Sequence, residues 1–335
     1  MIDKVRGYTN LFIVDSFTLD TLNETVNGTS LTAVCDYAVS QGLSIIVYFD
    51  YISHIIYPWQ FTWVSDAKAR YGSKLLGIYF YDEPGGKQID LGAWNNDTAL
   101  FSNATNYEQA ASTYVNSLSS IQSMRDLKAL GIPAFTSDYA LYWYDYLAGY
   151  SCVFAELGGT RGTNETSKIQ QIDFCRGAAD AQGKQWGAII TWAQNKPPYL
   201  ENGTLMLQNM LTAYRAGAKY IVIFNYPETN PYGNLTPDQF SAMEEFWDQT
   251  HSSQNSTFGT ANAQAALVLP EDYGWGMRTP TDKIWGIWNS DALSPVIWNK
   301  MNQLLSTYGL RLDIIYNDTA FNLEEKYSRI YYWNA

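Results

Sequence analysis

Histidine and cysteine are both scarce in this chain of 335 residues. The two histidines, His54 and His251, leave little material for a zinc site or for a Ser-His-Asp triad. The three cysteines show no metal-ligand spacing. We therefore predict no metal and no cofactor, and we expect any chemistry to rely on carboxylates, amides and tyrosines.

Three cysteines allow at most one disulfide bridge. Cys152 lies near the start of a predicted strand, and Cys175 lies within the helix that should return beside that strand. An antiparallel return would bring the two residues within bridging distance, and an exported protein would oxidise such a pair. A bridge between Cys152 and Cys175 is therefore predicted.

Basic residues are few, because 21 Lys and Arg face 33 Asp and Glu and give a formal net charge of -12. This charge repels phosphate backbones and anionic lipids. No apolar run reaches the roughly 18 residues that a membrane span needs, and the start of the chain lacks the apolar region of a signal peptide. We predict no nucleic-acid partner and no membrane span, and we expect any export signal to be absent from this sequence.

Asn-X-Ser is missing from the chain, whereas Asn-X-Thr occurs nine times. The acceptor residues are Asn23, Asn27, Asn96, Asn103, Asn164, Asn202, Asn234, Asn255 and Asn317. Pro237 directly follows the Asn234 sequon and disfavours that site. This excess of N-glycosylation acceptors predicts attached N-glycans and an extracellular or cell-surface location. Together with the low cysteine content, it indicates an archaeal surface protein more than a eukaryotic secreted one.

Glycine-rich phosphate loops are also absent, since neither GxGxxG nor GxxxxGK[ST] occurs, and this disfavours a doubly wound open sheet. Instead, amphipathic helical stretches repeatedly end near glycine and lead into β-branched or aromatic runs, the pattern of a parallel α/β sheet. These runs predict strands within 9–16, 40–50, 70–84, 129–139, 148–159, 181–194 and 215–228. We predict a TIM-type (β/α)8 barrel that lacks its first strand here, the strand lying upstream of Met1 or being supplied from elsewhere.

The barrel is predicted to span residues 1–250, in keeping with the usual size of such domains of about 250 residues. The polar run 251–264 reads as a linker. Residues 265–335 contain a strand, a loop rich in glycine and aromatics, a helix and a second strand. We therefore predict a small C-terminal α/β appendage.

Acidic and amide residues accumulate at the ends of the predicted strands, which is the face where barrel enzymes have their active sites. These residues are Asp15, Asp50, Glu83, Asp138, Glu156, Gln194 and Asn225. Side chains alternate along a strand, which directs Glu83 into the barrel mouth above Tyr79 and Tyr81. The opposite face should carry Leu76, Ile78, Phe80 and Asp82.

A second glutamate has the same orientation. In the segment 151–159, alternation directs Phe154 and Glu156 inward. The outward residues are Val153, Ala155 and Leu157. Glycosidic cleavage requires two carboxyl groups, one of which protonates the leaving oxygen while the other attacks the sugar or activates water. Glu83 and Glu156 are therefore the predicted pair.

The Asp-Glu-Pro sequence at 82–84 resembles the end of the fourth strand in barrel glycoside hydrolases, which often carry Asn-Glu-Pro there. The likeness covers residues 1 to about 250 as architecture but only Glu83-Pro84 as a motif. It implies that Glu83 is the general acid/base. Many of those families have a nucleophilic glutamate on the seventh strand, where this chain has Trp192 and Gln194, so Glu156 remains as the partner.

Other residues near the strand ends are predicted to assist. Supporting roles fall to Asp82, Tyr79, Tyr81, Asp50, Asp138, Gln194 and Asn225. Aromatic residues make up 16% of the chain, with 26 Tyr and 12 Trp, and such rings can stack on sugars. The predicted stacking residues are Tyr51, Trp143, Tyr144, Trp192 and Tyr226. The alternative is that these rings only pack in the core or at its rim.

The preferred function is an extracellular glycoside hydrolase with a carbohydrate as partner. The alternative is a non-catalytic surface protein, either a self-associating surface-layer or filament subunit or a glycan-binding module. Glu83 would then only cap a turn, and Glu156 would pair with Arg161. Two inward carboxyl groups within about 10 Å in an open aromatic cleft would favour the enzyme, whereas a plugged mouth would favour the alternative.

Overall fold

The computed structural model describes nine stretches of the chain. They are residues 1–15, 24–49, 58–90, 103–158, 165–191, 201–224, 235–251, 257–322 and 326–334. Within these stretches, no helix has the length and apolar character needed to cross a membrane.

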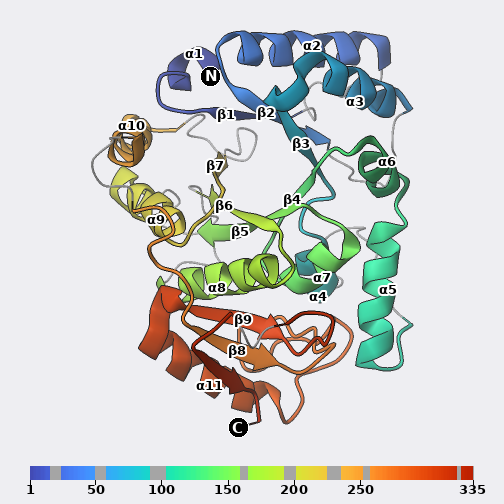
Figure 1. Cartoon of the computed structure of the whole chain (residues 1–335), viewed down its shortest axis with the longest axis vertical. Helices are drawn as coiled ribbons and strands as arrows, with labels where there is room; N and C mark the ends of the chain where they lie inside the picture. Colours follow the sequence, from blue (N-terminus) through green and yellow to red (C-terminus); the bar gives the residue numbers. More distant parts are fainter. Residues whose placement is uncertain are drawn as a thin grey trace.

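Seven strands form the main sheet, and each strand pairs in parallel with the next one along the chain. They are β1 (Leu11–Asp15), β2 (Ser44–Phe49), β3 (Leu75–Phe80), β4 (Ala134–Asp138), β5 (Cys152–Gly158), β6 (Gln185–Thr191) and β7 (Tyr220–Phe224). Figure 1 shows this sheet curling into a partial barrel. A doubly wound sheet would reverse its strand order, so that alternative is excluded. The curled parallel sheet confirms a TIM-type arrangement one strand short of eight in the described residues.

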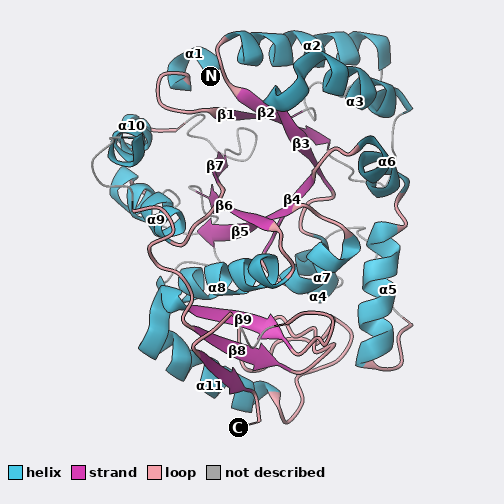
Figure 2. Cartoon of the chain, viewed as in Figure 1, coloured by secondary structure: helices cyan, strands magenta, loops and turns pink. Residues whose placement is uncertain are grey.

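Helices cover the outside of the curled sheet (Figure 2). The longer ones are α2 (Glu24–Ser40), α3 (Pro58–Tyr71), α5 (Tyr107–Ser119), α6 (Gln122–Leu130), α8 (Glu165–Ala181), α9 (Gly203–Arg215) and α10 (Pro237–His251). The shorter ones are α1 (Ile2–Val5), α4 (Pro84–Ile89) and α7 (Tyr142–Ala148). Local signals set their ends, since Asn106 caps α5 through the Gln109 N–H and Gly131 ends α6 with a φ of +61°.

Alternation along the strands separates two apolar layers. The barrel interior holds Ile46, Tyr79, Phe135, Cys152, Phe154 and Ile189. Residues of the opposite face, such as Val153, Ala155 and Leu157, join the larger cluster beneath the helices. These orientations in β5 agree with the sequence prediction. In β3 the prediction was wrong for Leu76, which packs against the interior cluster because the pairing with β2 shifts register beside it.

A second sheet of three parallel strands follows in the order β10-β8-β9. Its elements are β8 (Ala265–Leu269), α11 (Ser294–Tyr308), β9 (Leu312–Tyr316) and β10 (Arg329–Tyr332). The predicted strand-helix-strand order is present, and β10 is an addition that the sequence pattern did not reveal. Helix α8 lies between the two sheets (Figure 1). Its Gly177 permits this approach, because a Cβ there would stand 2.8 Å from the Ile314 carbonyl oxygen.

A buried cation joins α8 to the second sheet. The Arg176 guanidinium, on α8, donates to Asp313 on β9 at 2.8 Å and to Asp173 at 3.3 Å. It also donates to the Leu312 carbonyl at 2.7 Å. Arg176 is 3% exposed, and both carboxylates are 1% exposed or less, so the cation lies between two carboxyl groups away from water.

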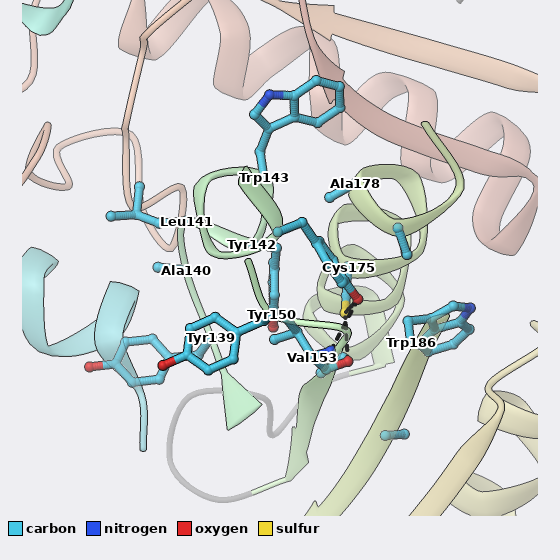
Figure 3. Close-up of a cluster of buried hydrophobic side chains, with 14 of the residues drawn as sticks. Tyr139, Ala140, Leu141, Tyr142, Trp143, Tyr150, Val153, Cys175, Ala178 and Trp186 are labelled. Carbon is cyan, nitrogen blue, oxygen red and sulfur yellow. Dashed lines mark hydrogen bonds between the residues drawn. The ribbon is translucent and has the colours of Figure 1, made fainter. Parts of the chain in front are cut away.

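The predicted bridge between Cys152 and Cys175 is not formed. All three cysteines of the chain are free, and all three are buried. Cys152 faces the barrel interior, whereas Cys175 packs from α8 against the outer face of β5. Figure 3 shows the Cys175 thiol directed at Val153, and its sulfur lies 3.4 Å from the Val153 carbonyl oxygen. Strand alternation therefore brings Val153, and not Cys152, towards the helix.

Candidate active site

The predicted site residues divide between described and undescribed parts of the chain. Tyr79, Tyr81, Asp82, Glu83, Asp138, Trp143, Tyr144 and Glu156 are described. Those outside the described residues are Asp50, Tyr51, Trp192, Gln194, Asn225 and Tyr226. Asp15 ends β1, with its side chain undescribed. The site must therefore be built from the carboxyl ends of β3, β4 and β5.

The chain leaves β3 through two residues with left-handed backbone, Tyr81 with a φ of +52° and Glu83 with a φ of +51°. Such a conformation costs a non-glycine residue about 1–3 kcal/mol and is often found at functional sites. The left-handed backbone of Tyr81 ends the alternation of side chains between the two faces of β3. Tyr81 consequently joins the outer cluster, so its predicted inward position was wrong, and Asp82 turns towards the barrel mouth instead.

A hydrogen-bonded network links the three strand ends. The Tyr79 hydroxyl contacts Asp82 and lies 2.7 Å from the Ser137 hydroxyl oxygen. The Ser137 hydroxyl in turn lies 3.0 Å from the nearer Asp82 oxygen and 3.2 Å from the Glu156 Oε1. Sequence reasoning missed Ser137, although its place one residue before Asp138 at a strand end was a usable signal. The network fixes Asp82 and Glu156 relative to each other.

Glu83 and Glu156 meet at the mouth through a side-chain hydrogen bond. Burial is the main cause that raises the pKa of Glu156 to about 7, and the hydrogen bond from Glu83 acts in the opposite direction. Both glutamates keep some exposed surface.

Asp138 lies beneath this pair and is fully buried. Its carboxylate accepts backbone N–H groups from Gly85 at 2.6 Å and Gly86 at 2.8 Å, which begin α4 directly after Glu83-Pro84. It also accepts the N–H groups of Tyr139 and Ala140. Burial raises the pKa of Asp138 to about 7 despite these bonds. Asp138 therefore holds the start of α4 in place.

The loop between β8 and α11 supports α4 from its other end. Gln88 of α4 donates to the Trp285 carbonyl at 2.9 Å. Arg278 binds Asp90, just after α4, at 2.8 Å and also binds Asp282 at 2.8 Å. The C-terminal region thus contributes to the position of the segment that carries Glu83.

Trp143 and Tyr144 are not available to stack on a substrate, so their predicted role was wrong. Each is 2% exposed. Figure 3 shows the Trp143 ring pointing away from the strands of the barrel, and it packs against Tyr316 of β9. Tyr144 packs against Trp285 with ring centroids 4.6 Å apart. Helix α7 therefore uses its aromatic side chains to attach the second sheet.

The described residues contain no group of three or more His, Cys, Asp or Glu side chains arranged to hold a metal ion. Of the glycosylation acceptors, Asn103 and Asn202 are exposed and Asn317 is partly buried. Asn27 lies in α2, with its side chain undescribed. The other acceptors, Asn23, Asn96, Asn164, Asn234 and Asn255, lie outside the described residues.

Comparison with solved structures supports the fold. The catalytic module of a family 98 glycoside hydrolase from Streptococcus pneumoniae TIGR4, solved with the H-disaccharide blood group antigen, matches 92% of this chain with a TM-score of 0.50 and 11% identity. The chain spans 55% of that module. A β-glucosidase from Exiguobacterium marinum matches 76% of this chain and 74% of its own, with a TM-score of 0.32 and 7% identity. No protein-family model matches the chain, and no curated protein does. The match to the family 98 module shows that the chain has a glycoside hydrolase-like fold.

Proposed function

We propose that this protein is a glycoside hydrolase in which Glu83 and Glu156 act as the paired carboxyl groups. The observation that carries the proposal is their hydrogen bond at the carboxyl end of a curled parallel sheet. Barrel enzymes place their catalytic residues at this end of the sheet. The glycoside hydrolase-like fold supports the same reading.

Glu83 is the proposed general acid. Glycosidic cleavage uses two carboxyl groups about 5–9.5 Å apart. Glu83 and Glu156, which are in hydrogen-bond contact here, would therefore separate when a sugar binds between them. Glu156 is the proposed partner, and its pKa of about 7 keeps part of the population ionised near neutral pH. A sugar that enters between the two would replace their mutual hydrogen bond with one from Glu83 to the glycosidic oxygen.

A panel of oligosaccharides and polysaccharides tests this function. The panel should include the H disaccharide, because the family 98 module was solved with it. We expect release of reducing ends from at least one neutral glycan, measured by mass spectrometry of the products. Binding to glycans without any hydrolysis would contradict the proposal and favour the non-catalytic glycan-binding alternative.

The protein is further proposed to be an exported, N-glycosylated cell-surface protein. The nine Asn-X-Thr sequons support this, as does the exposure of Asn103 and Asn202. The Asn202 Oδ1 accepts the Leu205 N–H at 2.9 Å, and this bond leaves the Nδ2 atom available for a glycan. We expect intact-mass analysis of native material to give a mass above the 37.9 kDa of the polypeptide. A bare polypeptide mass would refute both glycosylation and the surface location.

A further inference from the structure

We propose that Asp138 and Asp145 form a positioning pair that shares one proton and fixes Glu83 at the barrel mouth. The inference rests on the proposed role of Glu83, although each of its structural steps can be tested without a substrate. Asp138 ends β4, and Asp145 lies on α7. Both side chains are completely buried.

The first step is the attachment of Glu83 to Asp138. Pro84 has no N–H, so Gly85 and Gly86 supply the first free N–H groups of α4, and Asp138 accepts both. The close fit depends on glycine, since a Cβ on Gly85 would stand 2.4 Å from the Ala140 carbonyl oxygen. The N–H of Glu83 itself donates to the Ser137 carbonyl at 3.2 Å. Residues of β4 and the turn after it therefore hold Glu83 on both sides, and this maintains its left-handed backbone.

The second step is the proton on Asp145. Its Oδ1 accepts the Tyr114 hydroxyl at 2.6 Å. Its Oδ2 is buried, and no N–H or O–H of the described residues reaches it. The neighbouring group is the Asp138 carboxyl, with which Asp145 shares a hydrogen bond. Two carboxylates cannot share a hydrogen bond without a proton, so Asp145 Oδ2 must donate it.

The described residues around Asp138 and Asp145 provide no cation in contact with either carboxyl group, so a proton must reduce the negative charge of the pair. In the described residues neither carboxyl forms an ion pair with Lys or Arg. The groups facing the pair are acids, phenols and a thiol from six parts of the fold. They are Glu83 before α4, Tyr114 on α5, Tyr142 on α7, Tyr150 before β5, Glu156 on β5 and Cys175 on α8. Burial, and then the charge of Asp138, raise the pKa of Asp145 well above its usual range.

Loss of the shared proton would place two negative charges in contact inside the core. Their repulsion would move Asp138 away from the N–H groups of Gly85 and Gly86, and Glu83 would lose its support. Because the folded-state pKa of each acid is raised, this stabilisation is complete below their unfolded pKa of about 4 and decreases as the pH rises through the folded value. Asp138 loses its own proton at a pH of about 7, which leaves the single proton on Asp145. The pKa of Asp145 is raised well above its usual range, so the shared proton is lost only at higher pH.

The test follows the pair by NMR in protein labelled with ¹⁵N-glycine and with ¹³C in the glutamate carboxyl groups. In the wild type, we expect the amide signals of Gly85 and Gly86 and the carboxyl signal of Glu83 to shift together as the pH rises above about 7. In Asp145→Asn, the amide donates permanently to Asp138, while its oxygen still accepts the Tyr114 hydroxyl. The joint shift of Gly85, Gly86 and Glu83 should therefore be lost, and the Glu83 signal should then follow only the titration of Glu156, whose pKa is about 7.

Asp66→Asn, which changes an exposed carboxylate on α3, is the matched control and should behave as the wild type. If Asp145→Asn does not fold, Tyr114→Phe serves as the second variant, because removal of the hydroxyl should move the joint shift to higher pH. A Glu83 signal that ignores the Gly85 and Gly86 transition would overturn the positioning role. A failed glycan assay would instead count against the hydrolase function and leave these titrations unchanged.

Discussion

Glu83→Gln is expected to lower the turnover of a glycan substrate by about 10²–10⁴-fold, the usual contribution of a general acid. Glutamine keeps the shape of the side chain and can still donate a hydrogen bond to Glu156, but it has no proton to give to a leaving oxygen. The fold and the affinity for the sugar should therefore be retained. The measurement compares kcat and the sugar dissociation constant of wild type and variant on the substrate identified by the panel.

A matched control for this variant is Glu108→Gln, which changes an exposed glutamate in the first turn of α5. Its turnover should equal that of the wild type. Equal turnover by Glu83→Gln and the wild type would remove Glu83 from the mechanism. A loss of turnover accompanied by unfolding would assign Glu83 a structural role instead, since its left-handed backbone begins α4.

Arg176→Met is expected to lower the free energy of unfolding by about 3–5 kcal/mol, the range found when one partner of a buried ion pair is removed. Methionine fills much of the space of the arginine stem but leaves Asp173 and Asp313 as buried carboxylates without their cation. Denaturant unfolding followed by tryptophan fluorescence measures the change. Arg125→Met, on the exposed side of α6, should change the stability by less than about 0.5 kcal/mol.

Removal of a carboxylate together with the arginine provides a second check on the ion pair. Arg176→Met combined with Asp313→Leu should regain part of the lost stability, because fewer unpaired charges then remain in the core. A loss below 1 kcal/mol for the single variant would show that water reaches this network, in contradiction to the 3% exposure of Arg176.

The periodicity of apolar residues along the sequence was sufficient to predict the strands. It also predicted, for most strand residues, which face of the sheet the side chain occupies. The apolar runs and the glycines that precede them gave all seven parallel strands in order, because both signals are local. Alternation also placed Phe154 and Glu156 correctly. It failed at Leu76 and Tyr81, where a register shift and a left-handed residue change the direction of the side chains. Neither the register shift nor the left-handed backbone can be recognised from the pattern of apolar and polar residues.

The polar contacts of the site depend on which strands become neighbours, and the sequence could not show this. Ser137 joins Asp82 to Glu156 only because β4 lies between β3 and β5. In the sequence, Asp145 stands between tyrosine and tryptophan residues, and nothing there indicates a polar partner. Its partner Asp138 becomes apparent only in the fold, where α7 brings the two carboxyl groups together. Trp143 and Tyr144 were assigned to the mouth because they follow a strand end, but the second sheet covers them.

The position of α8 between the two sheets has a thermodynamic consequence. One face of this helix packs on β5, the other approaches β9 at Gly177, and the two sheets share one continuous apolar cluster. We therefore expect that the predicted boundary between barrel and appendage does not separate two independently stable bodies. Removal of residues after 264 would expose Arg176, Trp143 and Tyr144 to water and take away the support of α4 by Trp285. Cooperativity thus couples the stability of the C-terminal sheet to the geometry at Glu83, some two hundred residues earlier in the chain.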